Sequence, residues 1–176
     1  MKENKFTKKV LENVKTIFGA LLIASFIRSF LFQPFYIPSS SMEPTLLIGD
    51  RIFVSKYTYG FSKHSFPFSP SLFNDRFFYK EPQRGDAVVF KTPEDNRTDF
   101  IKRLIGLPGD ELQFIQGNIF LNNVKIERRK AEIYENIRCG KYILETNSFI
   151  ETLPNGKNYT AVYNKIGSLQ NTSKFK

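Results

Sequence analysis

The pattern of apolar positions changes near residue 45. Before it, residues 17–27 form an apolar run without a charged side chain, and Ser25 carries its only hydroxyl group. Residues 14–34 are long enough to cross a bilayer, because a spanning helix needs about 20 residues. The sequence therefore predicts a membrane-spanning helix over residues 14–34, which Pro34 and Pro38 end.

Two other interpretations of the apolar run compete with an anchor. A cleaved secretory signal should end in small residues spaced as A-x-A, and residues 28–34 offer no such site. A buried amphipathic helix should show a polar face, which the run lacks. Arg28 would cost roughly 3 kcal/mol at the bilayer centre, but near the helix end its long side chain can reach the interface. We therefore expect an uncleaved anchor.

Lysines crowd the segment that precedes the apolar run. Positive charge before a spanning helix favours a cytoplasmic N-terminus. The predicted organisation is a cytoplasmic tail over residues 1–13, a transmembrane anchor over 14–34 and a β-rich extracytoplasmic domain over 35–176. The lysines are Lys2, Lys5, Lys8, Lys9 and Lys15.

Beyond residue 45, short β-branched and aromatic runs alternate with Gly, Pro and Asn turns. Turns are expected at 116–117, 122–123 and 154–156, where they would join antiparallel neighbours. The predicted fold class is mainly β, with the helix followed by an antiparallel sheet or partial barrel. The polar residues 167–176 are expected to fray. The expected strands are 51–56, 86–91, 100–105, 111–115, 118–121, 124–126, 149–153 and 158–162.

An aromatic segment interrupts the strand pattern. Residues 57–79 hold six Phe side chains among Ser, Pro and Lys, without alternation. Such a loop can fold back onto the core, or it can lie at the bilayer interface near an anchor. Both alternatives stay open from the sequence.

Composition narrows the classes of function. The chain has 26 Lys and Arg against 17 Asp and Glu, but most basic residues beyond residue 28 are interspersed with acids. Because only 128–130 forms a tight basic cluster, no nucleic-acid partner is expected. A single cysteine, Cys139, and a single histidine, His64, argue against an internal disulfide, a Cys-pair zinc site and a His triad. No metal or cofactor is expected.

Lys102 is a candidate general base that would need no histidine. On a strand, Phe100, Lys102 and Leu104 share one face, so the lysine is expected to point into an apolar surface. Burial disfavours the charged ammonium, and a neutral amine is a competent general base. Ser41 lies in the Pro/Ser stretch 38–45, which on its own is typical of a linker.

Together, these segments resemble the bacterial type I signal peptidases, also called leader peptidases, a Ser/Lys-dyad family of membrane-bound serine proteases. IPSSSMEPTLLIGDRIFVSKYTYG (residues 37–60) is similar to the family's nucleophile box, and DFIKRLIGLPGD (99–110) to its lysine box. RGDAVVF (84–90) is similar to the strand box between them, and ETLPNG (151–156) to a later segment.

The resemblance implies a role for each matching residue. Ser41 matches the nucleophile and Lys102 the general base. The Ser39 hydroxyl and the Ser41 backbone N–H match the oxyanion hole. Narrow apolar pockets would accept small side chains at the first and third positions before the cut, which gives an A-x-A preference. The matching pocket residues are Ile37, Pro38, Met42, Leu46, Val89 and Ile101.

The implied function is removal of signal peptides from secreted preproteins. The resemblance places the enzyme in the bacterial inner membrane as a monomer, with its catalytic domain on the outer, periplasmic face. Ser41 lies nine residues after Phe32. An extended chain therefore keeps it within roughly 30 Å of the bilayer, where signal peptides present their cut sites.

One family motif has no match. The G-D-N-R-D-N-S box, which supports the lysine with a hydroxyl and a carboxylate, does not occur in the chain. We therefore expect a chain that lacks the C-terminal part of the family. The alternative function is a non-catalytic truncated remnant that binds signal peptides or a membrane partner through the same groove.

Overall fold

The computed structural model describes residues 5–66, 75–131, 136–139, 142–164 and 171–175. The chain divides into two compact units. Unit 1 combines residues 1–35 with 52–81, and unit 2 combines 36–51 with 82–176.

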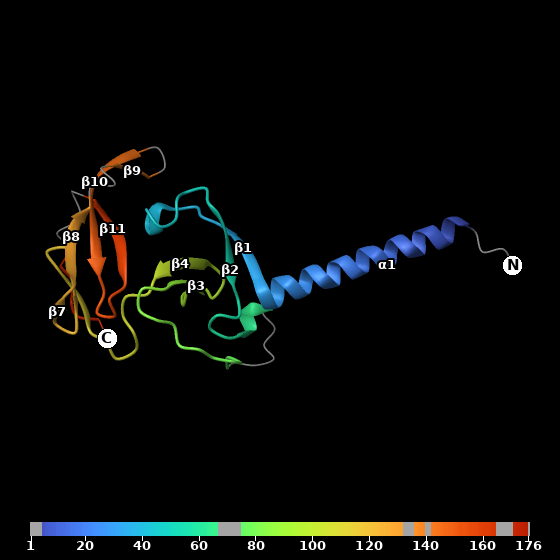
Figure 1. The fold of residues 1–176 in the computed structure, drawn as a ribbon, viewed down its shortest axis with the longest axis horizontal. Helices are drawn as coiled ribbons and strands as arrows, with labels where there is room; N and C mark the ends of the chain where they lie inside the picture. Colours follow the sequence, from blue (N-terminus) through green and yellow to red (C-terminus); the bar gives the residue numbers. More distant parts are fainter. Residues whose placement is uncertain (1–4, 67–74, 132–135, 140–141, 165–170, 176) are drawn as a thin grey trace. The chain divides into compact units, whose positions relative to one another are not determined.

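A long exposed helix begins unit 1 (Figure 1). The α-helix α1 (Lys5–Phe26) continues into a π-helical turn, Ile27–Leu31. The most apolar 18 residues of Thr7–Leu31 have a mean hydropathy of 1.7, and the apolar side chains are exposed along the helix. The helix is therefore long and apolar enough to cross a membrane, as the sequence predicts.

The helix ends before the prolines that were expected to end it. Residues from Phe32 onward are extended as strand β1 (Phe32–Tyr36), which pairs with β2 (Arg51–Ser55). The N–H of Lys56 donates to the carbonyl of Leu31 at 2.9 Å and continues this pairing to the helix end. The backbone therefore leaves the helix and pairs with β2 three residues before Pro34.

Part of the aromatic segment packs against the end of the helix in unit 1. The ring of Phe30 packs edge-on against Phe61 and Phe66, with centroids 5.6 and 5.4 Å apart. Phe77 and Phe78 are instead exposed. Phe68 and Phe73 lie outside the described residues.

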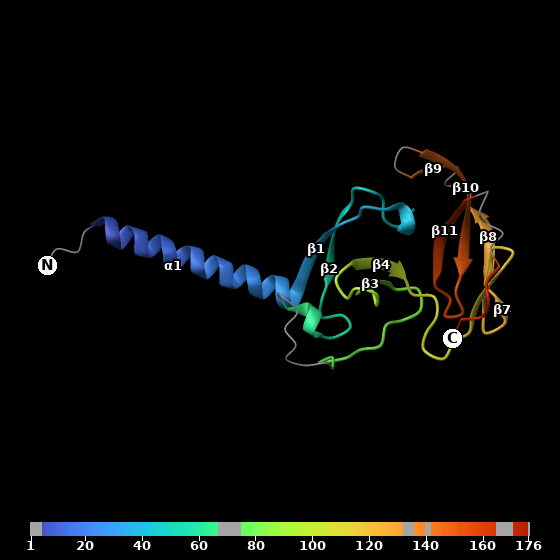
Figure 2. The same ribbon diagram turned by 180° about the vertical axis from the view of Figure 1, so that it is seen from behind.

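Unit 2 is built from short antiparallel strands. Strand β10 lies between β8 and β11, and its first residues pair with β9; Figures 1 and 2 show β8, β10 and β11 side by side. Strands β5, β6 and β7 form a second sheet, and β3 pairs with β4. The bounds are β3 (Ala87–Lys91), β4 (Asp99–Arg103), β5 (Leu112–Ile115), β6 (Asn118–Leu121), β7 (Val124–Lys125), β8 (Glu127–Ala131), β9 (Asn136–Cys139), β10 (Tyr142–Thr152) and β11 (Asn158–Asn164).

The hairpin predictions are confirmed. Gln116 and Gly117 have φ values of 48° and 71°, as a tight turn between β5 and β6 requires. Asn122 and Asn123 also have positive φ values and turn β6 into β7. The apolar residues that these hairpins bring together form a buried cluster of Ile119, Leu121, Ile126 and Leu153.

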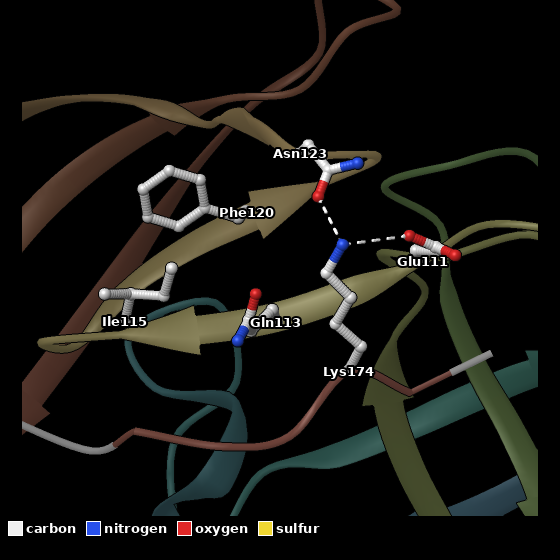
Figure 3. Close-up of a pocket in the computed structure, with 6 residues that line it drawn as sticks. All are labelled: Glu111, Gln113, Ile115, Phe120, Asn123 and Lys174. Carbon is white, nitrogen blue, oxygen red and sulfur yellow. Dashed lines mark hydrogen bonds and ion pairs between the residues drawn. The ribbon is translucent and has the colours of Figure 1, made fainter.

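The expected fraying of the C-terminal residues is wrong for 171–175. Leu112 and Phe175 exchange two backbone hydrogen bonds of 2.9 Å, so the segment pairs with the free edge of β5. Lys174 Nζ donates to Asn123 Oδ1 at 2.6 Å and lies 3.4 Å from Glu111 Oε2, at the rim of a small hollow (Figure 3). Edge pairing therefore orders a segment whose polar composition suggested a loose tail.

Glu151 is a buried carboxylate at the centre of the largest sheet. Its side chain is 1% exposed and accepts hydrogen bonds of 2.5 Å from the hydroxyls of Tyr159 and Tyr163 on β11. Burial, with Glu151 beside them, raises the pKa of both tyrosines. Because each carboxylate oxygen has a donor, the burial of this charge is compensated.

Candidate active site

Ser41 lies in a short 3-10 turn (Ser40–Met42) that two buried side chains hold in place. Ile37 before the turn and Met42 within it are both buried. The N–H of Ile37 donates to the carbonyl of Asp50 at 3.0 Å, and the N–H of Gly49 donates to the carbonyl of Ile37 at 2.9 Å. The buried Ile37 and Met42, with these backbone hydrogen bonds, therefore fix the backbone while the Ser41 side chain stays exposed.

Strand β4 brings Lys102 to this turn. Its Nζ donates to Ser41 Oγ at 2.5 Å, although the two residues are 61 positions apart in the chain. Ser39 Oγ lies 3.4 Å from Ser41 Oγ. The structure thus gathers the predicted nucleophile, base and oxyanion-hole residue in one place.

The expected burial of Lys102 is wrong. Lys102 is exposed, and its Nζ lies 5.6 Å from the ring centre of Phe100, which is itself 46% exposed. Phe100 and Lys102 do share a face of β4, as predicted. Among the described strands, however, β4 pairs only with β3, and this face of the two-stranded sheet remains open.

The predicted pocket residues are not all beside the Ser–Lys pair. In the β3–β4 register, Val88 opposes Lys102 and Val89 opposes Ile101. Directly opposed residues share a face, so Val89 and Ile101 lie on the sheet face away from Lys102. The others surround the Ser41 turn: Ile37 and Met42 are buried, Leu46 is half-buried and Pro38 is exposed.

Arg103 connects the segment after Ser41 to the residues before β3, through contacts that the sequence did not predict. Its guanidinium donates to Thr45 Oγ1 at 2.8 Å and to the carbonyl of Gly85 at 2.9 Å, and it lies 5.0 Å from the ring centre of Tyr159. In the described part of the chain, the Arg103 guanidinium makes these hydrogen bonds and this ring contact, and no ion pair. The sequence held one indication of this role. Arg103 directly follows Lys102 on a strand, and neighbouring strand residues point to opposite faces.

Two aspartates, Asp86 before β3 and Asp110 after β4, hold the neighbouring turns through hydrogen bonds and ion pairs. Asp110 accepts from Arg84 Nη1 and from the N–H of Leu107, both at 2.6 Å. These bonds, with one from Asn122, hold its pKa well below its usual range. Asp86 accepts from the N–H of Gln83 and pairs with a lysine.

The remaining candidates do not add a metal or cofactor site. His64 lies half-buried in the turn Lys63–Ser65 of unit 1. Cys139 ends β9, and its side chain lies outside the described part of the structure. Across the residues that the structure places, no group of three or more His, Cys, Asp or Glu side chains is arranged to hold a metal ion.

A serine hydroxyl in contact with a lysine amine can in principle supply a nucleophile and a proton acceptor. The chain belongs to the signal peptidase family, peptidase S26, whose pattern it matches over residues 10–170. It is 42% identical to signal peptidase I of Rickettsia bellii (strain OSU 85-389) over 159 residues, which are 89% of this chain and 54% of that protein.

Two further relatives give the same result. Signal peptidase I of Rickettsia akari (strain Hartford) is 46% identical over 79% of this chain and 52% of its own length. Signal peptidase I of Rickettsia typhi (strain ATCC VR-144 / Wilmington) is 44% identical over 88% of this chain and 58% of its own length. The chain thus spans about half the length of these relatives.

Proposed function

We propose that this chain is a membrane-anchored serine endopeptidase that removes signal peptides from preproteins after small residues. The main support for the proposal is the 2.5 Å contact between Lys102 Nζ and Ser41 Oγ. Family membership supports the class of substrate, since the relatives are named signal peptidase I.

The contact supports a two-step mechanism. Ser41 Oγ attacks the carbonyl carbon of the scissile bond, and its proton passes to the neutral Lys102 amine. The protonated lysine then gives that proton to the leaving amine as the peptide bond breaks. In the second step the amine takes a proton from water, which hydrolyses the acyl-enzyme and frees Ser41. The Ser39 hydroxyl and the Ser41 N–H are the proposed donors to the oxyanion.

The exposure of Lys102 supports a second candidate function. Both Ser41 and Lys102 are exposed, so among the described residues their contact is open to water rather than enclosed in a preorganised site. Lys102 lies on an open face of the β3–β4 sheet. The second candidate is a chain that binds signal peptides or a membrane partner without cleaving them.

A cleavage assay separates these two functions. The full chain, inserted into lipid vesicles, is incubated with a preprotein that carries an A-x-A site. If the dyad acts, Ser41→Ala and Lys102→Met each lower kcat/KM by roughly 1,000-fold or more. The matched controls are Ser40→Ala in the same turn and Lys91→Met on the paired strand, where Lys91 contacts Asp99 rather than Ser41. Both controls should change kcat/KM less than about twofold.

Each outcome has a clear meaning. Cleavage that survives both dyad substitutions excludes the Ser41–Lys102 mechanism. No cleavage by the unaltered chain, together with crosslinking of a radiolabelled signal peptide to it, supports the binding function. Replacing the small residue before the cut by Leu tests the proposed pocket, because a narrow apolar pocket rejects bulk by overlap.

The proposed location follows from the anchor. Lysines before the apolar run 17–27 favour a cytoplasmic N-terminus, with unit 2 at the outer face of a bacterial inner membrane. Protease added outside intact spheroplasts should then digest residues beyond 36. Protection of these residues until the cells are opened would reverse the proposed orientation.

A further inference from the structure

Unit 1 contains a hollow at the point where the apolar helix ends. Its volume is about 630 Å³, a size suited to a small ligand. The hollow includes no residue of the Ser41–Lys102 site. Its lining residues are Ala24, Ile27, Arg28, Phe32, Pro34 and Phe53.

The walls of the hollow are apolar and open to the surroundings. Phe53 on β2 is 76% exposed, and Ile27 and Phe32 are 43% and 41% exposed. Exposed apolar surface in one concave patch marks a binding site, because covering it removes it from water. The occupant therefore has an apolar portion.

Arg28 gives the same hollow a positive charge. It is exposed in the π-helical turn Ile27–Leu31, while its neighbour Ser29 is buried. π-turns in helices frequently occur at functional sites, where the extra residue changes the direction of the side chains. No carboxylate among the described residues forms an ion pair with the Arg28 guanidinium. The occupant therefore also has an anionic group.

We propose that this hollow binds one anionic phospholipid. The phosphate accepts hydrogen bonds from Arg28, and the glycerol and upper acyl chain lie against Ile27, Phe32 and Phe53. The proposal rests on the membrane anchor proposed above, because Arg28 lies at the end of the Thr7–Leu31 helix, at the depth of lipid headgroups. An apolar peptide helix fits less well, since it would cover the Phe side chains and leave the guanidinium without an anion.

The absence of tryptophan allows a direct test. Phe53→Trp places the only tryptophan of the chain in the hollow, and energy transfer to dansyl-labelled lipid reports which lipid lies next to it. The full chain is inserted into phosphatidylcholine vesicles with a small fraction of dansyl-phosphatidylglycerol or of dansyl-phosphatidylcholine. We expect about fivefold enrichment of phosphatidylglycerol next to the introduced tryptophan, the effect of one cation on an anionic lipid.

Matched variants locate the effect at Arg28. Adding Arg28→Gln should abolish the enrichment, whereas Lys15→Gln, which removes a charge from the same helix outside the hollow, should preserve it. Phe78→Trp, on an exposed side chain that does not line the hollow, should show no enrichment.

Other results overturn the lipid site. These are enrichment that survives Arg28→Gln, equal transfer from both lipids, or displacement of the dansyl lipid from the tryptophan of the Phe53→Trp chain by a synthetic signal peptide. Failure of the chain to sediment with the vesicles overturns the anchor and the lipid site together. None of these readouts uses cleavage, so they are independent of the peptidase assay.

Discussion

Replacing Glu151 by Gln tests whether the buried carboxylate holds unit 2 together. Both carboxylate oxygens accept a tyrosine hydroxyl at 2.5 Å, from Tyr159 and Tyr163, and the residue is 1% exposed. A glutamine keeps one acceptor oxygen, and its NH₂ group meets the second hydroxyl. That tyrosine must then turn its O–H away from residue 151 and loses this acceptor.

The expected magnitude follows from these two bonds. A buried hydroxyl that loses its acceptor costs about 1–3 kcal/mol. The remaining bond loses its ionic character, which costs about 1 kcal/mol more. Glu151→Gln should therefore lower the free energy of unfolding by about 2–4 kcal/mol. Glu127→Gln, at an exposed glutamate on the neighbouring strand β8, should change it by less than about 0.5 kcal/mol.

The assay is urea unfolding of the full chain in mild detergent, followed by tyrosine fluorescence. At roughly 1–2 kcal/mol per M urea, the expected loss lowers the unfolding midpoint by about 1–4 M. The pH dependence adds a second test. Because the tyrosine pKa values are raised on folding, their contribution is present below the ordinary tyrosine pKa of about 10 and is lost as the pH rises further. Tyr163→Phe should reduce this alkaline loss.

A Glu151→Gln chain as stable as the Glu127→Gln chain would contradict the expected loss. The same conclusion would follow if the unaltered chain kept its full stability well above pH 10. Either result would mean that the hydroxyls and the carboxylate are not in contact in the folded chain.

Three further predictions concern single residues. Leu153→Ala should lower the free energy of unfolding by about 3–5 kcal/mol in the same urea assay, because this side chain is 2% exposed in the core cluster. The pKa of Asp110 is lowered on folding, so the stabilisation it gives is present above the ordinary Asp pKa of about 4 and is lost in acid. Between pH 6 and pH 3, an Asp110→Asn chain should therefore lose less stability than the unaltered chain, as measured by thermal unfolding. Gly60→Ala should destabilise unit 1 more than Gly49→Ala destabilises unit 2. Both glycines have positive φ, but only a Cβ at residue 60 would clash, because it would lie 2.4 Å from the carbonyl oxygen of Phe77. Equal proteolysis rates for the two variants would contradict this prediction.

The tight turns and most short strands could be predicted because their signals are local. The Gln116-Gly117 and Asn122-Asn123 turns require positive φ values, which Gly and Asn adopt at low cost. Strands β8 and β9 were missed, since runs such as Glu-Arg-Arg-Lys carry little apolar alternation. Pairing with β10 places these residues in a sheet. Strand β9 forms a hairpin with the first residues of β10, whereas β8 pairs with the second half of β10, farther along the chain.

The sequence predicted which two residues form the candidate site, but not whether their surroundings bury them. The two motifs identified Ser41 and Lys102, and the fold brings their side chains into contact. The alternation of β4 also correctly placed Phe100 on the same face as Lys102. Whether that face is covered depends on what packs against it, which a strand's own sequence does not encode. The open face of the β3–β4 sheet therefore contradicted the expected burial.

The amino-acid sequence alone was enough to predict the apolar helix, the mainly β character of the remainder, the turns and the Ser41–Lys102 pair. Each of these depends on residue type and spacing within one short segment, or on a family motif. The three-dimensional structure was needed for the exposure of Lys102, the bracing by Arg103, the buried Glu151 with its two tyrosines, and the hollow at Arg28. Burial and hydrogen-bond partners come from segments distant in the chain, and their free energies depend on the geometry with which those segments meet.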